Sequence, residues 1–232
     1  LVGAPHVPDI PGLDGFEGPV CHTARWDASV SAPGMRVGVV GTGASAVQLV
    51  PRLVEAGARV TVFQRTAPWV IPKDDTAYSG AELAAFRADD AARALHRRRI
   101  FEEMDAGFAA RRIGTPEHAE LQAFALGHLR AQVADPELRA RITPDYATGC
   151  KRVGLSDEWY PALAQTGLTL ETSALDRVER GVAVAGSGAR HRLDSLVFAT
   201  GFEASRPSVA RLIRGRDGEL LDDHWRDGMT SY

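Results

Sequence analysis

MRVGVVGTGASA, residues 35–46, is the stretch that decides the fold. It opens with a short β-branched run of the kind that fills a parallel strand buried on both faces. The turn that follows, GTGASA, matches the pattern G-x-G-x-x-G/A. In that pattern the first glycine permits a tight turn, the second lets a pyrophosphate approach the backbone, and the small last residue lets the helix pack closely on the strand. The stretch therefore predicts a strand, a phosphate-binding turn and a helix.

The residues that follow this turn complete a βαβ unit. Val47–Val50 continue the predicted helix, Gly57 is placed to end it, and Arg59–Phe63 form a second β-branched strand. Amides at the helix N-terminus would face the phosphates, where the helix dipole favours negative charge. The alternative is a structural turn that binds nothing, and the context favours dinucleotide binding. The predicted nucleotide contacts are Gly41, Thr42, Gly43, Ala44, Ser45, Ala46 and Gln48.

The end of the second predicted strand distinguishes between the two nicotinamide cofactors. An NAD site usually places Asp or Glu about 20 residues after the turn, to hold the ribose 2′-hydroxyl. Here the sequence reads Gln64-Arg65-Thr66, without an acid. The planar guanidinium of Arg65 can bind a 2′-phosphate, although an ordinary solvated arginine is the alternative. We therefore predict NADP(H), with Arg65 and Thr66 among its contacts.

The composition of the chain limits its size class and argues against nucleic-acid-binding, membrane-spanning and disulfide-rich proteins. The chain has 232 residues, of which 44% are hydrophobic, and a net charge of −3, so it can form one large domain or two small ones. This charge does not suggest nucleic acid or an acidic membrane surface as a partner, and no apolar run approaches the roughly 20 residues of a membrane helix. Two cysteines, Cys21 and Cys150, are too few for a disulfide framework and favour a cytoplasmic location. No metal site is predicted.

The first 30 residues are rich in proline and glycine, which predicts an extended connector with turns rather than a core element. On periodicity alone, His22 and Trp26 would be an ordinary packed pair. The spacing F-x-G-x-x-x-H-x-x-x-W-[P/D] is nevertheless present at Phe16, Gly18, His22, Trp26 and Asp27. It resembles the fingerprint of the Baeyer-Villiger monooxygenases, a family of flavin-dependent enzymes in which the fingerprint precedes the NADP-binding turn, as it does here.

From Ser79 to about Arg141 the composition is helical, with few β-branched residues. A capping box at Ser79 and N-cap residues followed by proline at Thr115 and Asp135 predict helix starts. We expect three or four helices, one of which buries a stripe formed by Leu121, Ala125, Leu129 and Val133. The basic run at residues 96–99 is interpreted as a solvated helix face that pairs with nearby acids.

A second motif lies at residues 144–160, where the sequence reads PDYATGCKRVGLSDEWY. Without further context, Lys151-Arg152 would be an exposed basic dipeptide. The stretch resembles the PDY-x-x-GCKR-x-x-x-S-D-x-x-Y segment of the same family, especially of its members that act on aryl ketones, such as the 4-hydroxyacetophenone monooxygenases. The resemblance implies that Lys151 contacts the NADP phosphate and that Arg152 lies over the flavin as the catalytic group. A fixed guanidinium suits this place because the reacting species are anionic.

Short β-branched runs between Leu168 and Leu193 predict strands separated by turns that contain glycine. They lead into a buried strand that ends in Ala199-Thr200-Gly201. This ending resembles the second hallmark of two-dinucleotide flavoproteins, where the chain returns from the NADP domain to the FAD domain. The resemblance adds Ala199, Thr200 and Gly201 to the expected cofactor contacts.

These features predict an α/β fold: the Rossmann-like NADP-binding domain of a two-dinucleotide-binding flavoprotein, interrupted by an α-helical insertion and flanked by partial edges of the FAD domain. The expected segments are 1–30 (FAD-domain edge and linker with the fingerprint), 31–74 and 143–201 (the two parts of the NADP-binding domain), 75–142 (the helical insertion) and 202–232 (a truncated return to the FAD domain).

The resemblance implies an NADPH- and FAD-dependent monooxygenase that inserts one oxygen atom of O2 into a ketone to give an ester or lactone. Family members bind the FAD pyrophosphate with an earlier G-x-G-x-x-G, which these residues do not contain. We therefore expect a piece that folds around an NADP site and does not turn over by itself. Two alternatives stay open. One is a flavin monooxygenase acting on nitrogen or sulfur, against which the Trp26-Asp27 ending and Arg152 argue, and the other is an NADP-binding module without catalysis.

Overall fold

The computed structural model describes residues 3–30, 33–203 and 207–230. The chain divides into two compact units, Leu1–Thr66 with Gln165–Tyr232 and Ala67–Ala164, and each is described by itself. Within the described ranges, none of the helices combines the length and the apolar composition that a bilayer crossing requires.

The centre of the first unit is a five-stranded sheet with the strand order β1-β10-β2-β3-β6, in which all neighbours are parallel. Its strands are β1 (Val20–His22), β2 (Arg36–Val40), β3 (Arg59–Phe63), β6 (Leu168–Glu171) and β10 (Ser195–Phe198). Because all five strands run the same way, their carboxyl ends lie at one edge of the sheet, which is where ligands bind in open α/β folds.

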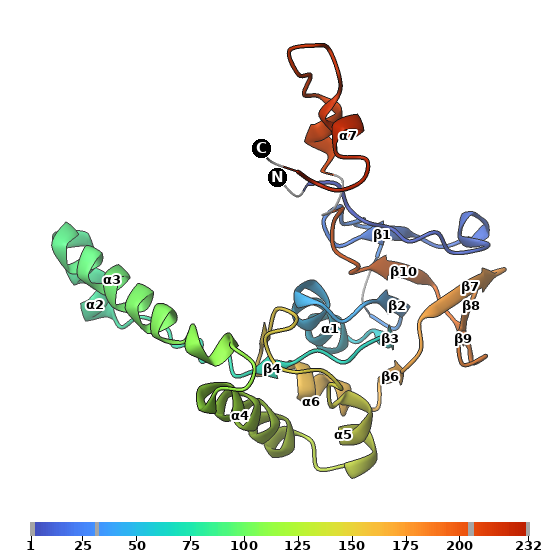
Figure 1. Ribbon diagram of the computed structural model, residues 1–232. Coiled ribbons are helices and arrows are strands. Elements are labelled where there is room, and N and C mark those ends of the chain that lie inside the picture. Colours follow the sequence, from blue (N-terminus) through green and yellow to red (C-terminus); the bar gives the residue numbers. More distant parts are fainter. Residues whose placement is uncertain (1–2, 31–32, 204–206, 231–232) are drawn as a thin grey trace. The chain divides into compact units, whose positions relative to one another are not determined.

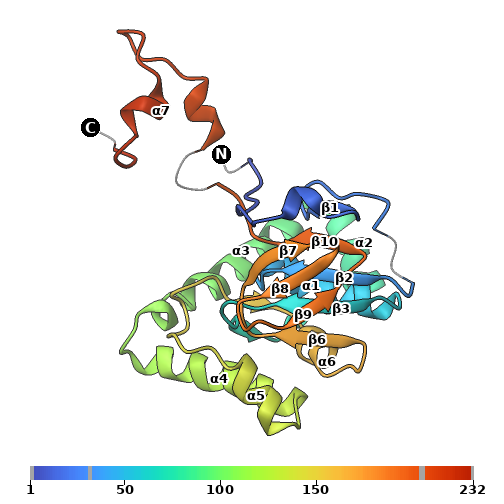
Figure 2. The ribbon, with the colours of Figure 1, turned by 90° about the vertical axis from the view of Figure 1, so that its right-hand side faces the viewer.

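Both faces of this sheet are covered (Figure 1). Helix α1 (Ala44–Glu55) lies on one face and buries Val47 and Val50. An antiparallel meander of β7 (Leu175–Glu179), β8 (Val182–Ala185) and β9 (Arg190–Arg192) lies on the other face, in front of the sheet in Figure 2. Side chains from both layers share one hydrophobic cluster, and so a continuous core holds the meander on the sheet.

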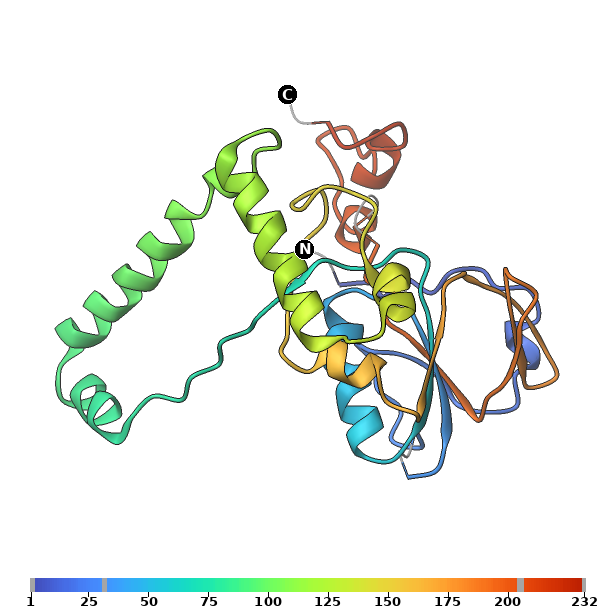
Figure 3. The same cartoon turned by 90° about the horizontal axis from the view of Figure 1, so that it is seen from below.

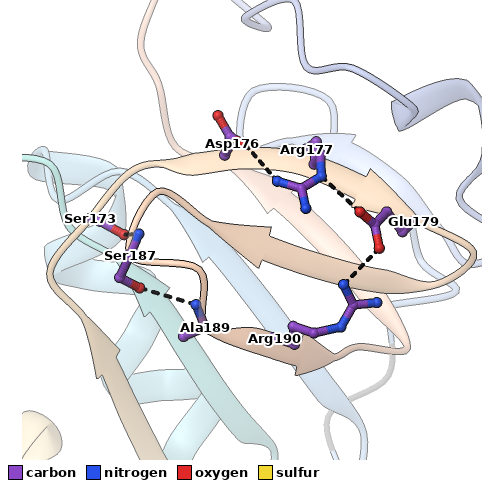
Figure 4. Close-up of polar contacts among 7 residues, drawn as sticks. All are labelled: Ser173, Asp176, Arg177, Glu179, Ser187, Ala189 and Arg190. Carbon is purple, nitrogen blue, oxygen red and sulfur yellow. Dashed lines mark hydrogen bonds and ion pairs between the residues drawn. The ribbon is translucent and has the colours of Figure 1, made fainter.

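The outer surface of the meander carries a chain of ion pairs (Figure 4). Arg177 lies between Asp176 and Glu179, and Glu179 also accepts a hydrogen bond from Arg190 of β9. Exposed pairs of this kind contribute little stability each. Arg190 and Arg192 also make β9 a charged edge strand, which discourages pairing with other chains.

The predicted strand-turn-helix-strand around the glycine-rich turn is confirmed, as is the parallel α/β class. Helix α1 ends at Glu55, and Gly57 follows with a φ of 87°. The prediction that residues 1–30 form no core element is wrong for Val20–His22, which form the edge strand β1. Three residues are too few to show an alternating pattern, yet Cys21 and His22 are buried. The remaining short helices of this unit are η1 (Leu13–Gly15), η3 (Ser208–Arg211) and α7 (Leu221–His224).

The second unit is mainly helical. It contains β4 (Val70–Ile71), α2 (Gly80–Ala88), α3 (Asp90–Ala106), η2 (Ala109–Arg111), α4 (Pro116–Gln132), α5 (Pro136–Ile142), β5 (Gly154–Leu155) and α6 (Trp159–Leu163). Figure 3 shows the extended segment that leads from β4 to α2, and the long helices α3 and α4. The predicted capping box at Ser79 is present, and the side chains of Thr115 and Asp135 cap α4 and α5 as expected.

Packing in the second unit is strongest around α4, which contacts β4 and α6. Of the predicted stripe, Ala125, Leu129 and Val133 are buried and Leu121 is partly buried. The basic residues of α3 are exposed or nearly so, and Arg99 pairs with Glu103. Strands β4 and β5 pair in parallel, so this unit extends beyond residues 75–142 and includes the segment with Lys151 and Arg152.

Candidate dinucleotide-binding site

The first part of the site is the turn after β2. Gly41 has a φ of 105°, and a Cβ atom there would lie 2.7 Å from the carbonyl oxygen of Ala199. Only glycine suits this backbone and this space. Ala199 itself donates its N–H to Val40 (2.9 Å), so the turns after β2 and β10 lie against each other at the carboxyl edge of the sheet.

The N-terminus of α1 opens at this edge. Gly43 is the N-cap residue, and no side chain in the described part of the chain caps the first amides of the helix. A Cβ atom at Gly43 would have no neighbour within 4 Å among the residues that the structure describes, which leaves room for a phosphate to approach the backbone. Ala46 is fully buried, as expected of a small residue between helix and strand. Gln48 donates its amide to the carbonyl oxygen of Ala44 (3.0 Å), so its side chain is bonded within the helix. Uncapped amides and open space fit the pyrophosphate of a dinucleotide.

Arg65 stands two residues after the end of β3. Its side chain is exposed and makes no hydrogen bond or ion pair with the described part of the chain. Thr66 is half-buried, and Gln64 is buried. A guanidinium without an internal partner, beside the turn that fits a pyrophosphate, fits the 2′-phosphate of NADP.

The Ala199-Thr200-Gly201 turn is fastened to the beginning of the chain. The Thr200 hydroxyl donates to the carbonyl oxygen of His6, and the His6 N–H donates to that of Gly201 (2.9 Å). Gly201 has a φ of 82°. Of the three predicted contacts in this turn, Ala199 lies against Gly41, whereas the Thr200 side chain is occupied by the chain's own backbone.

Two residues of the fingerprint are packing residues in this structure. Phe16 is buried in the cluster between the sheet and the meander. At Gly18 a Cβ atom would lie 2.1 Å from the carbonyl oxygen of Asp194 and 2.9 Å from Phe16. The fingerprint glycine is therefore required by close packing of the linker on the segment before β10.

The other fingerprint residues line an open cavity of about 670 Å³ beside β1. His22 is 5% exposed, its Nδ1 accepts a hydrogen bond from the Ala24 N–H (3.1 Å), and its Nε2 has no partner among the described residues. Trp26 is 45% exposed. Asp27 accepts hydrogen bonds from Ser29, which hold the pKa of its carboxyl below the ordinary value.

Lys151 and Arg152 belong to the second unit. The Lys151 ammonium lies over the ring of Tyr146, 4.6 Å from its centroid. The Trp69 indole N–H donates to the carbonyl oxygen of Tyr146 (2.8 Å), and burial raises the pKa of the Tyr146 hydroxyl. Arg152 is exposed and makes no hydrogen bond or ion pair with the described residues. Cys150 is exposed as well.

Sequence reasoning missed the hydrogen bonds that hold these loops in place. Trp69 holds the Tyr146 backbone across 77 positions of sequence. The Thr42 hydroxyl donates to the carbonyl oxygen of Thr66, 24 positions away (2.7 Å). No local pattern signals such contacts, because each depends on how distant segments are folded together. The structure brings together the predicted residues of the turns after β2, β3 and β10.

Comparison with known proteins extends this picture. The chain is 42% identical to a Baeyer-Villiger monooxygenase of Streptomyces coelicolor over 98% of its own length and 44% of that protein. It is 36% identical to a Baeyer-Villiger monooxygenase of Pseudomonas aeruginosa, again over 44% of that protein. The fold matches a crystal structure of OTEMO in complex with FAD and NADP with a TM-score of 0.83 and 27% identity, over all of this chain and 52% of that one.

No family model matches the chain. The similarity to the relatives nevertheless runs along almost all of its residues, and the solved structure shares its fold. The chain spans about half the length, or somewhat less, of the proteins that it matches. By sequence and by fold, the chain is similar to about half of a Baeyer-Villiger monooxygenase.

Proposed function

We propose that the protein containing this chain is an NADPH- and FAD-dependent monooxygenase that inserts one oxygen atom of O2 into a ketone to give an ester or lactone. The observation that carries the proposal is the 42% identity to a Baeyer-Villiger monooxygenase over 98% of this chain. The turn after β2, the uncapped α1 and the exposed Arg65 support the nucleotide part of this function.

Each site residue has a role in this proposal. Amides at the start of α1 bind the pyrophosphate, Arg65 and Thr66 bind the 2′-phosphate, and Lys151 is a second NADP contact. Arg152 is the catalytic group, and its guanidinium stabilises negative charge that develops on the reacting oxygen. Bound FAD would take electrons from NADPH and activate O2.

The domain division predicted from sequence, with residues 31–74 and 143–201 as the NADP-binding domain and 75–142 as an insertion, is part of this proposal. A reducing cytoplasm is the proposed location, which the small number of cysteines supports. A small ketone and O2 are the proposed substrates.

The test uses the full-length protein loaded with FAD, NADPH and a panel of aryl and cyclic ketones, with a sulfide as the competing substrate. We expect ketone-dependent NADPH consumption and an ester that carries one oxygen atom from labelled O2, detected by mass spectrometry. Arg152→Ala should lower the rate of ester formation by about 100-fold or more, since removal of one charge-stabilising donor has effects of this size. Arg111→Ala, a change at an exposed arginine in the same unit, is the control.

Two results would contradict the proposal. Oxygenation of the sulfide without any ester would indicate a heteroatom monooxygenase. Ester formation at the parent rate by Arg152→Ala would remove Arg152 from the catalytic role.

A further inference from the structure

The turn after β2 and the loop after β3 are joined by two hydrogen bonds. The Gly41 N–H donates to the carbonyl oxygen of Phe63 (3.1 Å). The Thr42 hydroxyl donates to the carbonyl oxygen of Thr66 (2.7 Å). Arg65 lies between the two acceptors in the sequence, so the backbone that carries its side chain is tied to the glycine-rich turn on both sides.

A third hydrogen bond holds the same loop from the other direction. The Gln64 N–H donates to the carbonyl oxygen of Glu171, at the end of β6 (2.8 Å). Two of the three ties are made by main-chain atoms on both sides and cannot be removed by substitution. The remaining hydrogen bond, from the Thr42 hydroxyl to the Thr66 carbonyl oxygen, uses a side chain and therefore depends on residue type.

We infer that Thr42 is a positioning residue for recognition of the 2′-phosphate. Its hydroxyl carries one hydrogen, and Thr66 accepts it, so the hydroxyl is not a donor to a phosphate in this arrangement. Thr42 acts through the loop: it fixes the distance between the backbone amides that face the pyrophosphate and the arginine that faces the 2′-phosphate. The inference rests on the proposed NADP site and adds a determinant of NADP over NAD preference.

The geometry matters because Arg65 itself is exposed and makes no hydrogen bond or ion pair with the described residues that would fix its place. A long side chain of this kind loses affinity when the backbone below it becomes mobile, since more freedom is lost on binding. Loss of the Thr42 hydroxyl should therefore weaken the binding of nucleotides that carry a 2′-phosphate and leave the others almost unchanged.

The experiment measures the dissociation constants of NADP⁺ and NAD⁺ for the full-length FAD-loaded protein by titration calorimetry. Thr42→Val keeps the side-chain volume and removes the hydroxyl. It should raise the dissociation constant of NADP⁺ about threefold to tenfold, the range expected for one hydrogen bond, and change that of NAD⁺ by less than about twofold. Thr42→Ser keeps the hydroxyl and should restore the NADP⁺ affinity. Thr42→Ala replaces Thr42→Val if the latter does not fold.

A double-mutant cycle with Arg65→Ala decides whether Thr42 acts through the arginine. In the Arg65→Ala background, Thr42→Val should have no further effect on NADP⁺ affinity. Independent, additive effects would overturn the inference, as would equal losses for NADP⁺ and NAD⁺ or no loss at all. If Arg65→Ala leaves the preference of the parent for NADP⁺ intact, the proposed role of Arg65 fails and the inference fails with it. If Arg65→Ala abolishes the preference for NADP⁺ over NAD⁺ but Thr42→Val has no effect, the inference about Thr42 is overturned and the proposed role of Arg65 stands.

Discussion

Main chain from a distant segment fills the space beside two glycines of the first unit. At Gly41 the nearest atom to an added Cβ is the carbonyl oxygen of Ala199, and at Gly18 it is that of Asp194. Gly41 is part of the phosphate-binding pattern and Gly18 part of the fingerprint, yet the physical requirement is the same in both. A residue that a motif assigns to function is also needed where two backbones meet closely.

Gly18→Ala should therefore destabilise the protein although it removes no contact. The new methyl group would lie 2.1 Å from a backbone oxygen, so the linker or the segment before β10 must move. We expect a loss of about 1–3 kcal/mol in the free energy of unfolding, measured with denaturant. The matched control is Gly15→Ala in the same linker, where an added Cβ has no neighbour within 4 Å. Equal stability of the two variants would show that the contact at Gly18 relaxes without cost.

At the scale of single residues, sequence patterns identified what each turn requires and failed to show which side chains hold it. The pattern G-x-G-x-x-G/A placed Gly41, Gly43 and Ala46 correctly at the turn and at the start of α1. The pattern was uninformative about the Thr42 hydroxyl, because the atom that accepts its hydrogen bond lies on another strand's loop.

At the scale of elements, β2 and β10 are joined at their starts as well as at their ends. The Asp194 carboxylate, just before β10, accepts hydrogen bonds from the backbone N–H (2.8 Å) and Nε (3.0 Å) of Arg36, the first residue of β2. These hydrogen bonds lower the pKa of Asp194 from 3.8 to about 2. The pair thus helps to set the register of two neighbouring strands.

This pair predicts a pH dependence of stability. Since the folded pKa of Asp194 is depressed, its contribution is present above the unfolded pKa of about 4 and is lost as the pH falls toward 2. The side chain is 36% exposed, so solvent screening limits the contribution to about 1 kcal/mol or less. Unfolding free energies of the parent and Asp194→Asn should differ by this amount at pH 6 to 7, and the difference should shrink below about pH 4 and vanish as the pH falls through about 2.

Arg36→Met removes the guanidinium but keeps the backbone N–H of residue 36, so it should reproduce that pH profile in part. If the difference in unfolding free energy between the parent and Asp194→Asn stays constant from pH 6 to pH 2.5, the Arg36–Asp194 pair is not the cause of that difference.

The elements themselves were predictable where patterns were long. Strand β3 begins and ends at Arg59 and Phe63 as expected, and the caps at Ser79, Thr115 and Asp135 start their helices. The edge strand β1 was missed because three residues among prolines and glycines show no period. Its place in the sheet comes from pairing with β10, nearly 180 residues later in the sequence.

At the scale of the whole molecule, the order of motifs carried more information than any one motif. A glycine-rich turn predicts a nucleotide, and Arg65 predicts which one, but neither predicts oxygenation of a ketone. That step came from resemblance, and similarity to Baeyer-Villiger monooxygenases along 98% of the chain supports it. Motif chemistry by itself does not predict oxygenation of a ketone, because the groups that react with a ketone are supplied by cofactors and by loops with no shared sequence pattern.

The span of the similarity leads to a prediction about the 232 residues taken alone. They cover 44% of a Baeyer-Villiger monooxygenase and contain one glycine-rich turn of the dinucleotide type. We expect the purified chain to bind NADP⁺ in calorimetry and to retain no visible flavin absorbance after incubation with FAD and gel filtration. The full-length protein, treated in the same way, should keep its flavin.

The Arg65→Ala variant of the 232-residue chain is the control for NADP⁺ binding. It should lose most of the calorimetric NADP⁺ signal if that signal belongs to the proposed site. A flavin spectrum retained by the short chain would contradict the prediction, and it would mean that the edges of the FAD domain hold the isoalloxazine without a second glycine-rich turn.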